Sequence, residues 1–197
     1  MLKSRTYFAG AIALAAALAL SSCAGGSAAT DSTTSSAEAS SATFNDADVT
    51  FAQMMIPHHE QAVEMSDDLL AKDGIDQAIV DLATEIKAAQ EPEITQLNDW
   101  LTEWESEDNS MSGMTDMDDG AEGMMSDDDM MALQNATETD AGRLFLEQMT
   151  VHHEGAVEMA QLEIDNGENA DARALAENIL TTQTAEIAVM AELLATL

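Results

Sequence analysis

The sequence predicts an all-α protein, a four-helix bundle built from two repeated helical hairpins. The first observation is a duplicated block: residues 51–65 and 145–159 share the pattern Met-x-x-His-His-Glu and contain every histidine of the chain. The second is that the repeat continues at an offset of 93, with apolar residues that step by three and four. Each half therefore predicts a His-bearing helix, a short turn at glycine and a second long helix. No stretch alternates with a period of two, so we expect no sheet.

The duplicated domain is expected to span residues 45–197. Repeat 1 covers residues 45–105, repeat 2 covers residues 132–197, and residues 106–131 between them form an acidic loop rich in methionine. A length of about 150 residues is enough for one compact domain with its own core.

Polar residues at the expected helix starts support these bounds. Asn45, with Asp48 three residues later, is typical of an N-cap before the first helix. Asp76 is expected to precede the second helix, and Asp140 is expected to open the third.

Two prolines fall inside the expected helices. Pro57 immediately precedes His58, and proline there removes a backbone donor and clashes with the preceding turn. We therefore expect a kink or local irregularity at Pro57 and a bend at Pro92. Neither proline is repeated in the other half, so the architecture does not require them.

The chain begins with the organisation of a lipoprotein signal peptide over residues 1–22. A basic start precedes an apolar run that is too short to span a membrane, and small residues lead to Cys23, the only cysteine. Cys23 is therefore expected to carry a lipid that holds the exported domain on the outer face of the cell membrane. An ordinary secretory signal is the alternative. Residues 23–44, rich in Ser, Ala and Thr, predict a flexible tether.

Charge restricts the partners. The formal net charge is −32, from 38 acidic and 6 basic residues. This charge excludes nucleic acid and anionic lipid as electrostatic partners. It fits a surface that attracts cations, but the charge taken alone favours a solubilising or salt-adapted exported surface.

The duplicated block predicts a metal site, because paired imidazoles beside thioethers are donors that suit a soft ion. Met55 lies three residues before His58 and four before His59, so its sulfur can share one ion with either ring. Met65 lies seven residues past His58, about 10 Å along the axis. It therefore joins a donor from a neighbouring helix or belongs to a second site. The candidate ligands of both repeats are Met55, His58, His59, Met65, Met149, His152, His153 and Met159.

The donor types favour copper. Thioether sulfur selects Cu(I), or its mimic Ag(I), whereas imidazole also accepts Cu(II) and zinc. A di-iron centre in a bundle uses Glu-x-x-His, but here methionine stands three residues before His58 and His152. The His-Glu-x-x-His pattern of a zinc protease is absent.

Further polar positions leave alternatives open. Glu60 and Glu154 either orient an imidazole or lie in solvent. Gln90 and Gln183 interrupt the apolar seam at matched places, where they either support the His pairs by hydrogen bonds or fix the register of the bundle. Met54 is a secondary, weaker candidate ligand.

The loop over residues 106–131 holds seven methionines and nine acidic residues. Ser126 begins a pattern typical of a capping box, which predicts a short helix towards Asn135. The residues expected to pack on the bundle are Met130, Met131 and Leu133. Weak metal capture is expected of three methionines spaced i, i+3 and i+6 among Asp and Ser, namely Met111, Met114 and Met117.

The chain resembles the domain-of-unknown-function family 305. The resemblance rests on residues 145–159, on Gln183-x-x-Glu186-Ile187-x-x-Met190, and on the same block in repeat 1. It implies a ferritin-like helical fold and an exported protein that binds copper through Met and His ligands, the eight candidates given above. One departure is Gln148, which stands where repeat 1 has Met54.

These observations lead to one functional hypothesis and two alternatives. The hypothesis is an extracytoplasmic lipoprotein, not an enzyme, that binds copper, with Cu(I) favoured, as a buffer or carrier in copper tolerance. Its partners would be the ion, the membrane through the lipid anchor alone, and a copper-handling protein. The alternatives are a ferritin-like metal-dependent redox enzyme and a metal-free surface interaction protein. If the two His-bearing helices are adjacent, the blocks can form one site; if not, they form two.

Overall fold

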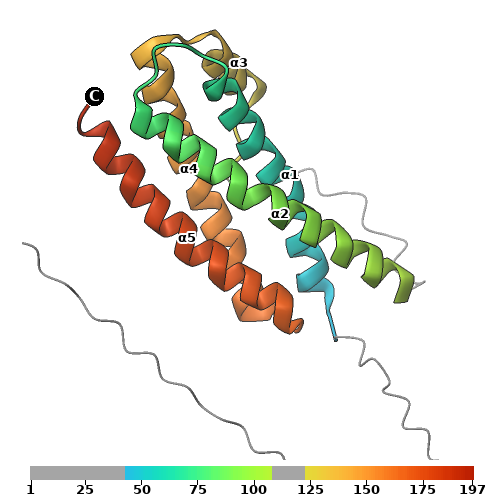
Figure 1. Cartoon of the computed structure of the whole chain (residues 1–197). Helices are drawn as coiled ribbons and strands as arrows, with labels where there is room; N and C mark the ends of the chain where they lie inside the picture. Colours follow the sequence, from blue (N-terminus) through green and yellow to red (C-terminus); the bar gives the residue numbers. More distant parts are fainter. Residues whose placement is uncertain (1–42, 108–122) are drawn as a thin grey trace, which may run out of the picture. The chain divides into compact units, whose positions relative to one another are not determined.

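The computed structural model describes residues 43–107 and 123–197, and no strand occurs in these residues (Figure 1). The helices are α1 (Asp46–Leu70), α2 (Gln77–Glu107), α3 (Asp127–Asn135), α4 (Glu138–Asn166) and α5 (Ala170–Leu194). The predicted all-α bundle of two helical hairpins, α1–α2 and α4–α5, is therefore confirmed.

Several predictions concern residues outside the described ranges. They are the signal peptide over residues 1–22, Cys23, most of the tether over residues 23–44, and the metal capture by Met111, Met114 and Met117. In the described part of the chain, no helix combines the length and the apolar character that crossing a membrane requires.

The two hairpins meet along the His-bearing helices. α1 packs on α2 and on α4, and α4 packs on α5. α1 and α4 are antiparallel, since Asn45 at the start of α1 donates its side-chain N–H to the carbonyl of Asn166, 2.9 Å away, at the end of α4. α3 lies across both α1 and α4 near one end (Figure 1). This arrangement brings the two repeated blocks to one seam.

Helix caps agree with the sequence at three of four places. Asn45 and Ser126 each form a capping box, so the predicted short helix after Ser126 is confirmed as α3. Asp76 accepts a hydrogen bond from the backbone N–H of Ala78 at 2.8 Å.

The prediction for Asp140 was wrong. α4 begins two residues earlier, at Glu138, and its N-cap Thr137 makes no side-chain hydrogen bond. α3 ends at Asn135, so the chain has only two residues in which to turn, and Glu138 takes a positive φ of 52°. The short connection between α3 and α4 therefore determines where α4 begins, and no side chain caps this helix start.

Both prolines lie inside uninterrupted helices. α1 continues through Pro57 and α2 continues through Pro92, and both rings are exposed. α1 thus continues past the position where a kink was expected, and the kink itself stays a prediction.

The core consists of two apolar clusters along the bundle axis. One cluster includes Met65, Met149 and Met190, and α3 adds Met130 and Leu133 to it. The expected packing of Met130 and Leu133 is confirmed, whereas Met131 is half exposed. The other cluster includes Met55, Phe51 and Met159, together with Trp104, on which Phe44 stacks. Each cluster draws residues from all four long helices.

A buried carboxylate ties α1 to the turn between α4 and α5. Asp48 is fully buried and accepts hydrogen bonds from the backbone N–H groups of Glu168 and Asn169, at 3.2 and 2.9 Å. Glu163 is buried beside it. Burial raises the pKa of Glu163 to about 8, and the neighbouring Asp48 adds to the rise while Arg173 opposes it.

Glu163→Gln is therefore expected to stabilise the metal-free protein, and more so at higher pH. The folded state keeps the proton of Glu163 up to a pH of about 8, whereas the unfolded chain releases it near its ordinary value of 4.5. Wild-type stability thus falls as pH rises between these values, and the neutral amide avoids that loss. Thermal unfolding at pH 5 and pH 8.5 checks this, with exposed Glu168→Gln as the control. An equal effect at both pH values would contradict it.

Candidate metal centre

A layer of polar side chains separates the two apolar clusters at the middle of the bundle. On each long helix, buried residues of one cluster precede the layer and buried residues of the other follow it. This His layer consists of His58, His59, Gln90, His152, His153 and Gln183, all buried.

The two repeated blocks converge in this layer. The ring of His58 on α1 lies against the ring of His152 on α4, with 3.7 Å between centroids and 37° between planes. α1 and α4 are adjacent. The two blocks therefore lie in one shared region of the bundle and not in two distant regions.

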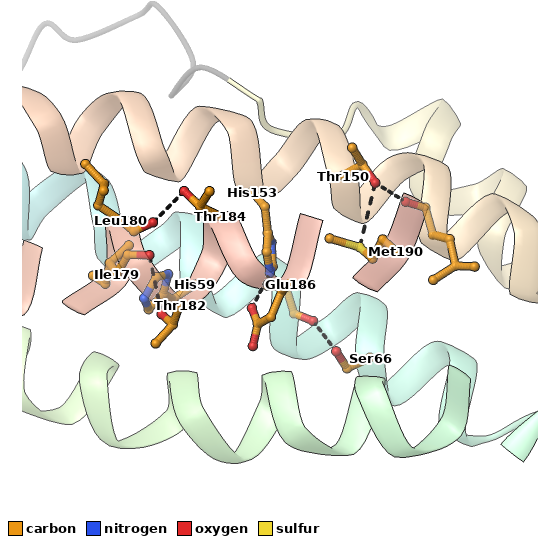
Figure 2. A network of polar contacts seen from close by, with 12 residues as sticks. His59, Ser66, Thr150, His153, Ile179, Leu180, Thr182, Thr184, Glu186 and Met190 are labelled. Carbon is orange, nitrogen blue, oxygen red and sulfur yellow. Dashed lines mark hydrogen bonds and ion pairs between the residues drawn. The ribbon is translucent and has the colours of Figure 1, made fainter. Parts of the chain in front are cut away.

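Two imidazole–carboxylate contacts flank the His58–His152 ring pair at matched positions. His59 Nε2 lies 2.8 Å from Glu93 Oε2 on α2, and His153 Nε2 lies 2.7 Å from Glu186 Oε2 on α5. Figure 2 shows Glu186 reaching His153 across the α4–α5 contact. Glu93 and Glu186 are equivalent at the repeat offset of 93, so the layer has pseudo-twofold symmetry.

These carboxylates select the tautomer of both rings. An ionised carboxylate only accepts hydrogen bonds, so Nε2 of His59 and of His153 carries the proton. In the neutral ring each Nδ1 then keeps its lone pair, and both Nδ1 atoms are buried without a hydrogen-bond partner in the described residues. A carboxylate that holds the outer ring nitrogen while the inner one is bare is how metal-ligating histidines are oriented in proteins.

His152 is also held in the form that binds metal. Burial, followed by the nearby imidazoles of His58, His153 and His59, holds the pKa of His152 well below its usual range. The backbone of His58 opposes this shift only in part, and neither ring nitrogen of His152 makes a hydrogen bond of good geometry within the described ranges. A neutral imidazole with a bare nitrogen is a donor for a transition metal, and a costly group to bury otherwise.

The methionine candidates fall into two classes. Met55 and Met149 are fully buried one helical turn from the His pairs and border the His layer on opposite sides. Met65 shares its cluster with Met149, and Met159 shares its cluster with Met55. Both lie seven residues from the stacked histidine of their own helix, about 10 Å away along the axis. The donors nearest the layer are thus Met55 and Met149.

Imidazole and carboxylate alone do not form a site in the described residues. No group of three or more His, Cys, Asp or Glu side chains there is placed to hold a metal ion. An ion in the His layer therefore needs the thioethers as additional donors, which agrees with a soft metal.

The carboxylates that contact the rings were not those considered from the sequence. Glu60 and Glu154 are exposed, so of the two alternatives considered for them they lie in solvent and do not orient an imidazole. Gln90 and Gln183 lie in the His layer, and neither amide oxygen has a hydrogen-bond partner among the described residues. The sequence did contain a signal for Glu93 and Glu186. Each lies three residues after one of the two matched glutamines, and the two positions are related by the offset of 93.

A short segment covers the seam beside the layer. Gly123 has a φ of 84°, and a Cβ there would lie 2.7 Å from the carbonyl oxygen of Val151 and 3.0 Å from Cα of Gly155. The side chain of Gln61 binds both backbone groups of Met125, at 2.9 and 2.7 Å. Residues 123–125 are thus fixed to α1 and α4 within one turn of the histidines.

The fold recurs in known proteins. Residues 48–194 match the family described as Domain of unknown function (DUF305). The chain belongs to this family. A DUF305 protein from Streptomyces coelicolor is 34% identical, with a TM-score of 0.67 over 76% of this chain and 91% of that chain. A DUF305 fragment from Deinococcus radiodurans is 28% identical, with a TM-score of 0.66 over 79% of this chain and 99% of that chain.

CopM is another structural neighbour of this DUF305 chain. Its Cu(I)-bound form is 29% identical, with a TM-score of 0.62 over 76% of this chain and 96% of that chain. CopM has also been solved in Cu(II)-bound and Ag-bound forms. No curated protein matches the chain.

Proposed function

We propose that this protein binds copper, with Cu(I) favoured, in the His layer, and acts as a metal buffer or carrier. The observation that carries the proposal is the pair of buried histidines, His59 and His153, whose Nδ1 atoms lack partners while carboxylates hold their Nε2 atoms. Met55 and Met149 would supply the thioethers that favour Cu(I) over zinc. The copper- and silver-bound forms of CopM support this choice of metal.

Titration of the purified domain with Cu(I) against a competing chelator tests the proposal. We expect at least one ion to be retained and Ag(I) to displace it, because both ions prefer thioether donors. If elemental analysis finds no metal after exposure to copper, the hypothesis of a metal-free surface interaction protein is favoured instead.

The carboxylates that orient the rings should matter for affinity. Replacement of both by Glu93→Gln and Glu186→Gln exchanges the charged acceptors of the Nε2 protons for neutral amide oxygens, which hold the rings more weakly, and is expected to weaken copper binding by about 10–100-fold. The same chelator competition measures this. The matched control is Glu60→Gln with Glu154→Gln, since these carboxylates are exposed and belong to the same repeats. Equal losses in the two double variants would show a general charge effect.

The location of the protein is part of the proposal. We infer from the pattern around Cys23 that the mature chain is lipid-anchored on the extracytoplasmic face of the cell membrane. Cys23→Ser is expected to move the protein from the membrane fraction to the soluble exported fraction. Fractionation followed by immunoblotting measures this, and a membrane-bound Cys23→Ser variant would contradict the anchor.

Binding without catalysis fits the layer better than a redox enzyme does. The carboxylates near the rings already contact His59 and His153, and no cluster of three imidazole or carboxylate groups is available for iron in the described residues. Turnover of peroxide or of Fe(II) by the metal-loaded protein would favour the enzyme instead.

A further inference from the structure

The His layer is closed to solvent. All four of its histidines are fully buried, with 0% of each exposed. An ion or a small reagent that reaches these rings must therefore pass a part of the structure that moves. α2 and α5 cover the side of the layer where Glu93 and Glu186 contact the outer histidines. Opening that side would separate long helices that share both apolar clusters.

Residues 123–125, here called the strap, cover the other side of the layer. On α1 the strap is bound by Gln61, which lies about 200° around the helix from His59, the residue that faces α2. On α4 the strap lies against Gly155, since a Cβ on Gly123 would be 3.0 Å from Cα of Gly155. The strap therefore bridges α1 and α4 on the face that α2 and α5 leave uncovered.

The strap also crosses directly over the central ring pair. Gln61 comes three residues after His58, and Gly155 comes three residues after His152, so the two strap contacts are equivalent positions of the two repeats. A segment that touches both positions crosses the pseudo-twofold axis of the layer. The contact between the rings of His58 and His152 joins equivalent positions as well, and lies on the same axis.

The strap is held by few groups. The side chain of Gln61 donates to the carbonyl of Met125 at 2.9 Å and accepts from its N–H at 2.7 Å. No residue of the strap lies in a helix, and no backbone–backbone hydrogen bond joins the strap to other described residues. Segments with few buried contacts open locally at a lower free energy than packed helices do. The strap is thus the part beside the layer that opens most easily.

The repeat shows that this arrangement is not a general result of the fold. Repeat 1 has glutamine at the position that binds the strap, whereas repeat 2 has Gly155 at the equivalent position. A side chain at Gly155 would fill the space that Gly123 occupies, because the two backbones approach so closely there. One position thus supplies the side chain that holds the strap, and its equivalent supplies the room.

We propose that the strap is the gate by which an ion enters and leaves the His layer, and that Gln61 is the positioning residue that keeps it closed. The gate rests on the proposed function, because it describes how the copper site is reached. Gln61 acts through the strap and sets the rates of exchange. The affinity of the site is set by the donor groups of the layer.

Diethyl pyrocarbonate, which acylates unprotonated imidazole nitrogens, tests the gate in the metal-free protein. The chain has four histidines and all of them lie in the layer, so the initial rate for an untagged sample reports access to the layer alone. Gln61→Leu removes both hydrogen bonds to the strap. We expect it to speed the modification by about 10–100-fold, since each net hydrogen bond changes an opening equilibrium by a few-fold to about tenfold.

Two further variants keep this test decisive. Gly123→Ala disturbs the other end of the strap, where its Cβ would lie 2.7 Å from the carbonyl oxygen of Val151, and should also speed the modification. Gln161→Leu makes the same exchange as Gln61→Leu at an exposed position of α4 and should leave the rate unchanged. Hydrogen exchange read by mass spectrometry should show faster exchange in the strap and not in the cores of α1 and α4. If neither strap variant reacts faster, or if both helices also exchange faster, the gate is overturned.

Release of silver to an excess of chelator measures the ion itself. In Gln61→Leu we expect silver to bind and to leave faster by similar factors. The Kd should change by less than about threefold, because the closed form remains the dominant one. A large change in Kd with unaltered rates of binding would assign Gln61 to the site and overturn the gate. If silver does not bind while the modification results hold, the proposed function fails and the gate stands as the route to the layer.

Discussion

His152→Leu is expected to stabilise the metal-free protein while it abolishes tight copper binding. Both ring nitrogens of His152 are buried without partners in the described residues. Replacement of such a group by an apolar side chain of similar volume removes its desolvation penalty, about 1–3 kcal/mol. For a domain of this size, each kcal/mol raises Tm by about 2–4 °C. A histidine retained only for packing would not show this opposition between stability and function.

The pH dependence of this variant has a definite sign. The pKa of His152 is lowered in the folded state, so below a pH of about 6.5 the unfolded chain binds a proton that the folded chain does not. Wild-type stability therefore falls on acidification, and the advantage of His152→Leu should be larger at pH 5 than at pH 8. Thermal unfolding of the metal-free proteins measures it.

Chelator competition completes the test of His152. Loss of a direct ligand should cost more than the 10–100-fold typical of a residue that only orients a ligand, so we expect a drop of more than about 100-fold. If His152→Leu lowers stability and leaves copper affinity unchanged, the ring has a structural role.

Met55→Leu combined with Met149→Leu is expected to weaken Cu(I) binding far more than zinc binding. Exchange of methionine for leucine conserves volume and usually costs less than about 1.5 kcal/mol, so the fold should persist. The exchange removes the two thioethers nearest the His layer and leaves the imidazoles, which zinc also accepts. We expect the affinity for Cu(I) to fall by about 100-fold or more, because two direct ligands are lost. The affinity for zinc should fall by less than about tenfold.

The control for the methionine pair is Met65→Leu combined with Met190→Leu. These side chains are also fully buried, but they lie farther from the His layer, because Met65 comes seven residues after His58 and Met190 seven residues after Gln183. Competition assays with each metal, alongside unfolding curves, compare the two double variants. Equal losses of Cu(I) affinity in both would mean that the effect arises from core packing.

The helices and their pairing into hairpins were predictable because local periodicity determines them. The offset of 93 links two amphipathic stripes, and Asn45 and Ser126 mark helix starts by their own side chains. The start of α4 was not predictable from Asp140, because the short connection from α3 places it. A local signal cannot report such a tertiary constraint.

The types of donor were predictable, but their pairing was not. Spacing on one helix put Met55 within reach of His58, yet it could not tell whether α1 lies beside α4. The contact of His58 with His152 and the contact of Glu93 with His59 join residues from different helices. Both depend on how the hairpins pack, and that information lies in tertiary contacts and not in the spacing of either block.

The pseudo-twofold symmetry of the His layer bears on how such a protein could arise. One hairpin already carries every kind of side chain in the layer, and the contact of His58 with His152 joins equivalent positions. Two identical hairpins related by a twofold axis would therefore build the same centre as a homodimer. Fusion into one chain keeps that symmetry where the histidines meet and frees each end of the seam to change alone. Glu163 in one half and Leu69 in the other are a difference that a dimer of identical hairpins does not permit.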